Sequence, residues 1–148
     1  MLWKYITFLN RPWEVRIMAK RESVKLASDL ADLVQTPGGH TDLRRSIVDI
    51  SGKVKYFTVT GVEGIQLGNH YHESTAEEFY VVRGSLRIKL EDTRTKERAE
   101  YEVIPGQSIG MPLYVAHLVL PEPGTEFVNI CEIDFDPAVD IHPYPIIW

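Results

Sequence analysis

Residues 68–84, GNHYHESTAEEFYVVRG, decide the fold of this chain. His70 and His72 are separated by one residue, and Glu77 follows five positions after the second histidine. Side chains two apart on a β-strand share a face, so the two imidazoles are expected to project together. Glu77 shares strand parity with the apolar Phe79 and faces the interior if that side chain does. Polar side chains that face inward need a partner, because a buried carboxylate without one is costly.

A divalent cation would satisfy this group, since imidazole nitrogen and carboxylate oxygen suit zinc, iron, manganese or nickel. A fourth ligand is expected from another strand. His117 shares a face with Val115 and Val119 in GQSIGMPLYVAHLVL, residues 106–120. A single histidine on an apolar strand is more often a core residue than a ligand. His117 is nevertheless the candidate for the fourth ligand, because the remaining histidines, His40 and His142, lie in loop-like segments.

The rest of the chain predicts an all-β domain. Short runs rich in β-branched and aromatic residues alternate with Gly- and Pro-containing turns, which favours a sandwich or barrel. Residues 22–35 are predicted as a helix, because apolar side chains recur there at three- and four-residue intervals before Pro37. We therefore expect an N-terminal extension with one helix over residues 1–40 and a β-barrel domain over residues 41–148.

The composition excludes several classes of function. A chain of 148 residues with 44% hydrophobic and 25% charged residues is typical of one globular domain. The net charge of −5 gives no basis for binding nucleic acid. The apolar part of residues 1–13 is too short for a signal peptide, and no stretch predicts a membrane span, so we expect a cytoplasmic protein. Cys131 is the single cysteine and is expected to be an inert core thiol.

The two histidine-containing segments resemble the two sequence motifs of the cupin superfamily. Residues 64–84 match the first motif in every position, and residues 106–117 are similar to the second. The resemblance implies a double-stranded β-helix, which is a jelly-roll-like antiparallel barrel. Its metal ligands would be His70, His72, Glu77 and His117. Tyr114 stands where the second motif usually has Gly, and Pro121 where it usually has Asn, but neither is a ligand position.

Three functions fit such a barrel. The first is a metal-dependent enzyme that acts on a small polar metabolite, with a carbohydrate favoured, inside a mostly apolar pocket. Tyr114 and His117 are its candidate catalytic residues. The expected walls of this pocket are Phe57, Val59, Ile65, Phe79, Val81, Leu86, Ile88, Val115, Val119 and Phe127. Another function is that of a non-catalytic module that binds a small molecule in the barrel, and the remaining one is that of a metal-free enzyme.

The second function is that of a metal-free sugar-nucleotide epimerase or ketoisomerase. Residues 81–95 and 111–120 are similar to the dTDP-sugar enzymes of this kind, and residues 61–72 resemble cupin domains attached to capsular-sugar reductases. Residues 40–50 are similar to the D-x-R-G opening of the former, except that Arg45 replaces the Gly. No cluster of inward Arg and Lys that would hold a diphosphate is evident.

In such an enzyme, His72 or His117 would remove a proton next to a ketone. Tyr114 or Tyr80 would return it. We also expect a homodimer, because cupins commonly cover an open barrel edge with a second subunit and because Trp148 lies in an apolar tail.

Overall fold

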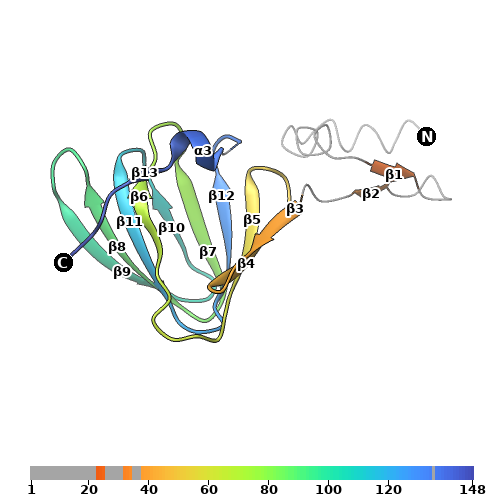
Figure 1. Cartoon of the computed structure of the whole chain (residues 1–148), viewed down its shortest axis with the longest axis horizontal. Helices are drawn as coiled ribbons and strands as arrows, with labels where there is room; N and C mark the ends of the chain where they lie inside the picture. The colour runs from red at the N-terminus through yellow and green to blue at the C-terminus, as the bar shows by residue number, and fades with distance from the viewer. Residues whose placement is uncertain (1–22, 26–31, 35–37, 135) are drawn as a thin grey trace.

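The computed structural model of the chain describes residues 23–25, 32–34, 38–134 and 136–148 (Figure 1). The described part is almost entirely β-structure. One sheet consists of β3 (Gly38–Thr41), β4 (Arg45–Asp49), β5 (Val54–Val59), β7 (Glu77–Arg83), β10 (Ser108–Met111) and β12 (Glu126–Cys131). These strands pair antiparallel in the order β10-β7-β12-β5-β4-β3.

A second antiparallel sheet lies beside the first in Figure 1. It consists of β6 (Leu67–Tyr71), β8 (Leu86–Asp92), β9 (Arg98–Val103), β11 (Val115–Pro121) and β13 (His142–Pro143). Their order is β13-β6-β11-β8-β9. The short helix α3 (Pro137–Asp140) crosses the upper end of the barrel in this view. No helix in the described ranges is long and apolar enough to cross a membrane.

Strand alternation places the core between the two sheets. Along β7, buried and exposed side chains alternate, and Phe79 and Val81 point inward. The rings of Phe57 and Phe127 stack with centroids 4.6 Å apart. The core cluster contains Phe57, Val59, Ile65, Leu67, Phe79, Val81, Leu86, Ile88, Val103, Met111, Val119 and Phe127. This architecture confirms the expected all-β, jelly-roll-like antiparallel barrel.

The helix predicted over residues 22–35 is wrong where the structure describes that stretch. β1 (Ser23–Lys25) and β2 (Asp32–Val34) form a two-stranded antiparallel sheet instead. Val24 and Val34 are β-branched, so strand pairing suits them better than a helix does. Residues 26–31 lie outside the described residues. The domain division at residue 40 stays a prediction.

The C-terminal tail packs along the second sheet of its own barrel. β13 pairs with β6, which brings the chain back over the strand that carries His70. Further on, Tyr144 Oη donates to Glu91 Oε1 at 2.6 Å, and Trp148 Nε1 donates to Glu91 Oε2 at 3.0 Å. Glu91 is buried and also accepts from Arg98 Nε at 2.9 Å. These bonds fix the tail on the outer face of β8.

Candidate metal centre

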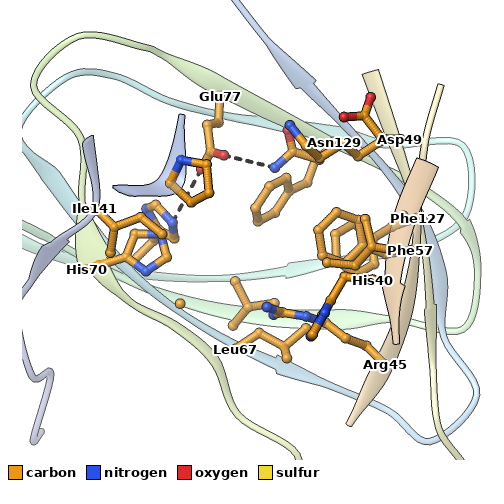
Figure 2. Close-up of a pocket in the computed structure, with 18 of the residues that line it drawn as sticks. His40, Arg45, Asp49, Phe57, Leu67, His70, Glu77, Phe127, Asn129 and Ile141 are labelled. Carbon is orange, nitrogen blue, oxygen red and sulfur yellow. Dashed lines mark hydrogen bonds and ion pairs between the residues drawn. The ribbon is translucent and has the colours of Figure 1, made fainter. Parts of the chain in front are cut away.

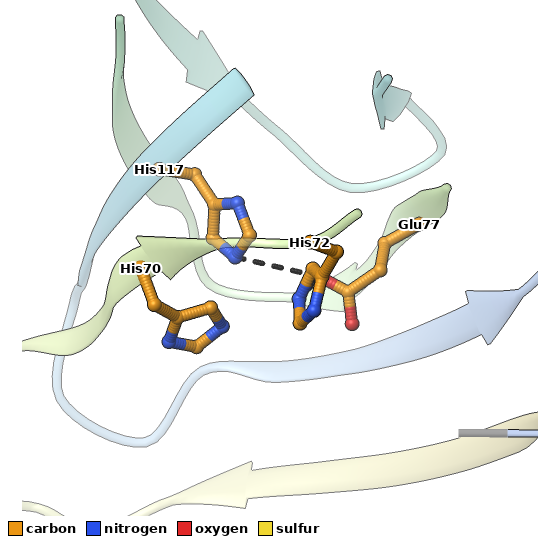
Figure 3. Close-up of side chains that lie close together, drawn as sticks. All are labelled: His70, His72, Glu77 and His117. Atoms are coloured by element: carbon orange, nitrogen blue, oxygen red, sulfur yellow. Dashed lines mark hydrogen bonds and ion pairs between the residues drawn. The ribbon is translucent and has the colours of Figure 1, made fainter. Parts of the chain in front are cut away.

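The four predicted metal ligands come together in the barrel. Each offers one ligand atom, and these atoms all lie within 4.8 Å of one another (Figure 3). Strand β6 carries His70, the turn after it carries His72, β7 begins with Glu77, and β11 carries His117. Both sheets therefore contribute to one cluster.

The pairing of β6 with β11 sets the position of the imidazoles. His70 is the register partner of His117, and the register shifts between His117 and Leu118. Gly68 has a φ of +81°, and a Cβ there would lie 2.6 Å from the carbonyl oxygen of His117. A side chain at Gly68 would push the two strands apart, so glycine is needed for their close approach.

The side chains converge on one oxygen of Glu77. Its Oε2 lies 3.1 Å from His72 Nε2 and 3.4 Å from His117 Nε2. The ring of His70 lies 4.7 Å from that of His117 and 4.8 Å from that of His72, measured between centroids. His72, Glu77 and His117 are buried, and His70 is half-buried.

Contacts outside the cluster hold its members in orientation. His72 Nδ1 donates to the carbonyl oxygen of Asp140 at 2.6 Å, which directs Nε2 toward Glu77. Asn129 Nδ2 donates to Glu77 Oε1 at 2.9 Å and leaves Oε2 facing the histidines. Supporting hydrogen bonds of this kind are the usual surroundings of metal ligands.

Asp140 was not found by sequence reasoning. Its carboxylate accepts hydrogen bonds from the backbone N–H groups of Glu73 (2.8 Å), Ser74 (3.2 Å) and Thr75 (3.1 Å), so it shapes the turn between His72 and Glu77. Asp140 is buried although it lies near the C-terminus. An acidic residue in an isolated DPAVDIHP segment carries no sequence signal for this role.

The electrostatics of the cluster favour a bound cation. Burial opposes the charge of Glu77, but the hydrogen bond from His72 and the neighbouring imidazoles lower its pKa to about 2. Burial and the neighbouring His117 and His72 lower the pKa of His70 to about 4, and burial also lowers the pKa of His117. Two neutral imidazoles therefore share the site with a carboxylate.

His72 behaves differently from the other two histidines. Burial by itself lowers its pKa, but the hydrogen bond and charge of Glu77 outweigh burial and raise it. Because Nδ1 carries the proton that is donated to Asp140, the Nε2 of a neutral His72 would present a lone pair to the Glu77 carboxylate. A proton or a metal ion between the two groups removes this repulsion. Three imidazoles and one carboxylate are a donor set that fits a divalent transition metal.

A cavity of about 370 Å³ opens beside the cluster (Figure 2). His70, Glu77 and His117 line it. Its apolar walls include Ile47, Phe57, Leu67, Phe79, Val119, Phe127 and Ile141. The expectation of a mostly apolar pocket around the cluster holds for Phe57, Phe79, Val119 and Phe127. The other predicted wall residues lie in the core or, like Val115, are half-buried elsewhere.

The structure does not bring Tyr114 to this cavity. Tyr114 is not among the described residues that line the cavity. Its φ of +63° and its position in the turn place its ring under the guanidinium of Arg94, 4.9 Å from centroid to Cζ. The non-glycine residue at this motif position therefore points its side chain along the outside. Tyr80, the other candidate acid, is exposed on the outer face of β7.

Polar and charged residues that were not predicted from the sequence line the opposite part of the cavity. His40, Arg45, Asp49 and Lys55 contribute to its wall. Arg45 and Lys55 therefore both face inward, although the register places Arg45 opposite Val59 and Lys55 opposite Asp49 and so keeps the two cations apart. Strand alternation carried the signal, since Arg45 shares parity with Ile47 and Lys55 with Phe57.

The cysteine has no place in the ligand set. Cys131 is buried, and burial is the main cause that raises the pKa of its thiol to about 12. Its Sγ lies 3.1 Å from Asn129 Oδ1. A thiol held protonated in this way is a poor nucleophile and a poor ligand, as predicted.

The two-sheet barrel and the inward His–Glu cluster define a protein with the cupin fold. Residues 34–131 match the sequence model of the polysaccharide biosynthesis C-terminal domain family, and the chain belongs to this family. A comparison with curated proteins gives no match.

Solved structures share the fold at low sequence identity. The capsular polysaccharide assembling protein CapF from Staphylococcus aureus superposes with a TM-score of 0.67 and 21% identity over 82% of this chain and 34% of its own. A mutant of Bacillus subtilis oxalate decarboxylase gives 0.59 and 19% over 73% of this chain and 30% of its own. This chain therefore spans about a third of the length of either protein.

A third structure has a similar length. The QdtA 3,4-ketoisomerase from Thermoanaerobacterium thermosaccharolyticum, a double mutant in complex with TDP, gives a TM-score of 0.54 and 19% identity. The match covers 82% of both chains. At these identities the comparisons with solved structures establish the fold alone.

Proposed function

We propose that this protein is a metal-dependent enzyme that acts on a small, oxygen-rich metabolite of the carbohydrate class. One observation carries the proposal. Three members of the four-residue cluster, His70, Glu77 and His117, also line the cavity, so a metal held there is reached from the substrate space. Structural zinc sites are usually closed and built from cysteines, which this cluster lacks.

A divalent zinc, iron, manganese or nickel ion would polarise a substrate carbonyl or lower the pKa of a bound water. The protein's own residues prepare the site for such chemistry. Asp140 and Asn129 hold His72 and Glu77 in fixed orientations. The apolar walls around Phe79 and Phe127 lower the local dielectric constant, which strengthens electrostatic interactions in this part of the cavity.

The carbohydrate class is supported by the comparisons. The family is described by polysaccharide biosynthesis, and one structural neighbour is a capsular polysaccharide assembling protein. Another is a ketoisomerase in complex with TDP. A cavity of about 370 Å³ is also at the small end of the range for ligand pockets, which suits one sugar ring.

A metal-free acid–base enzyme on a sugar nucleotide is the second candidate. It is favoured by the hydrogen-bonded series Asp140–His72–Glu77, in which a carbonyl and a carboxylate flank a histidine with a raised pKa. In this case His72 or His117 would carry the proton that leaves a carbon next to a ketone.

Deuterium incorporation tests both candidates and separates them from a binding module. Metal-loaded and chelator-treated protein would be incubated in heavy water with keto sugars, both free and nucleotide-linked, and exchange would be read by mass spectrometry. Exchange that requires the metal supports the proposed function, and exchange that survives chelation supports the metal-free enzyme. The absence of exchange or any other turnover, with metal bound, contradicts both and favours the non-catalytic module.

A further inference from the structure

Arg45 carries a buried hydrogen-bond donor that the protein leaves unused. Its Nε is shielded from solvent and has no hydrogen-bond partner among the described residues. The guanidinium lies over the ring of Phe57, with Cζ 5.5 Å from the centroid. A buried donor without a partner costs free energy, and native proteins rarely keep one. The Nε itself lies out of reach of a ligand, and the guanidinium that lines the cavity leaves its terminal nitrogens as the donors that a ligand can bond.

The acidic residues Asp42 and Asp49, which are the candidates to pair with Arg45, are already engaged with other groups. Asp42 Oδ2 pairs with Arg44 Nη2 at 2.9 Å, and Asp42 Oδ1 accepts from the backbone N–H groups of Arg44 and Arg45. On the cavity wall, Asp49 Oδ1 accepts from the backbone N–H of Gly52 at 2.6 Å. Among the described residues, neither carboxylate accepts a hydrogen bond from the side chain of Arg45.

The charge balance of the cavity favours an anion. Arg45 and Lys55 supply two cations to its wall, and Asp49 and Glu77 supply two carboxylates. A divalent ion at the cluster therefore leaves the lining with net positive charge. His40 adds a further nitrogen on the side of Arg45, and Figure 2 shows both residues across the cavity from His70.

We propose that Arg45 anchors an oxyanion subsite that binds a carboxylate or phosphate group of the substrate. The opposite end of the same molecule then faces the cluster of His70, Glu77 and His117. This inference deepens the proposed function, on which it rests for the reacting end of the substrate. It makes the substrate an acidic sugar or a sugar phosphate rather than a neutral sugar.

The chemistry of the guanidinium fits this assignment. Its two terminal nitrogens form a planar fork that matches two oxygens of a carboxylate or phosphate. The cation–π contact with Phe57 restrains the guanidinium, and the apolar walls make the charge-assisted bonds stronger than they would be in water.

Binding of three matched probes tests the subsite. Phenyl phosphate, benzoate and benzyl alcohol share an aromatic ring and differ in the charged group, and their affinities would be measured by calorimetry. Metal-loaded and chelator-treated forms would both be titrated, with metal content determined separately. The variants are Arg45→Met, which removes the charge, and Arg45→Lys, which keeps it without the fork. Arg87→Met removes an exposed arginine from β8 outside the cavity and serves as the control.

We expect at least one anion to bind about tenfold or more tighter than the alcohol. Arg45→Met should abolish the preference, Arg45→Lys should restore part of it, and Arg87→Met should retain it. Whichever anion binds more tightly identifies a phosphate or a carboxylate substrate. An unchanged preference in Arg45→Met, or one that depends on the metal alone, would overturn the subsite. A wild-type protein that cannot be loaded with metal would instead count against the proposed function, so the two failures are distinct.

Discussion

His72 Nδ1 lies 2.6 Å from the carbonyl oxygen of Asp140, a residue 68 positions further along the chain. The carboxylate of the same aspartate caps the backbone of the turn that leads from His72 to Glu77. One residue near the C-terminus therefore fixes both the orientation of His72 and the shape of the segment that joins it to Glu77, two of the proposed metal ligands. The tail is part of the site.

Asp140→Ala is expected to weaken metal binding by roughly 10- to 100-fold, as is usual when a supporting residue of a metal site is lost. The variant removes the carboxylate that holds the turn after His72 while keeping the four ligands. Competition with a chromogenic chelator measures the affinity. Asp136→Ala removes the exposed N-cap of α3 and is the control. Equal affinity in wild type and Asp140→Ala would show that the cluster is oriented without Asp140.

Phe127→Ala should lower the free energy of unfolding by about 3–5 kcal/mol. The ring is 1% exposed and stacks on Phe57, so its removal leaves a cavity between the sheets. Denaturant unfolding measures the change. Tyr101→Ala, on the exposed face of β9, should cost much less. A decrease in the free energy of unfolding smaller than that of Tyr101→Ala would mean that the Phe57–Phe127 contact does not stabilise the core.

The metal-free protein should lose stability as the pH falls from 6.5 to about 4. The pKa of His70 drops from its ordinary value of 6.5 to about 4, so the unfolded chain takes up a proton that the folded chain excludes. Proton uptake by the unfolded state lowers the free energy of unfolding over this interval. His117 acts in the same direction, whereas the raised pKa of His72 opposes it.

Thermal melting of chelator-treated protein across this interval measures the effect. His70→Gln, which cannot titrate, should flatten the dependence. A melting temperature that stays level in the wild type, or an equal slope in His70→Gln, would contradict the role assigned to this imidazole.

We predict a homodimer that covers the outer face of the six-stranded sheet. The register places Tyr80 beside Val128, Val128 beside Tyr56, and Tyr56 beside Val48, so four apolar side chains form a row across β7, β12, β5 and β4. Tyr80 and Val48 are exposed in the single chain. Exposed apolar rows of this kind are typical of protein interfaces.

Light scattering at micromolar concentration should give twice the mass of one chain. Val128→Lys places a charge in the middle of the row and should give the monomer. A monomeric wild type would rule out the dimer, and a dimeric Val128→Lys would move the interface elsewhere.

The sequence was sufficient for the parts of the site that depend on strand parity and motif spacing. His70, His72 and Glu77 are close in the chain, and His117 lies on a strand whose alternation points it inward. Local geometry and one pairing therefore determine the cluster. The barrel follows from the same alternation, because each short strand buries one face.

Other features depend on tertiary contacts that no local pattern encodes. Asp140 reaches the cluster only because β13 folds back along β6. The partnerless state of Arg45 Nε is a property of the packed cavity and cannot be read from parity alone. Residues 23–25 and 32–34 pair as strands although their apolar spacing also suits a helix, since short periodic patterns do not separate the two.

Elemental analysis of untagged protein tests the central claim most directly, alongside His72→Ala and the control His40→Ala. His40 lines the same cavity but lies outside the cluster of four ligands. Circular dichroism would establish that both variants are folded. We predict about one equivalent of a transition metal per chain in the wild type and in His40→Ala, and its loss in His72→Ala. A wild-type protein that holds no metal, even after reconstitution with zinc, iron, manganese or nickel, would contradict the metal centre.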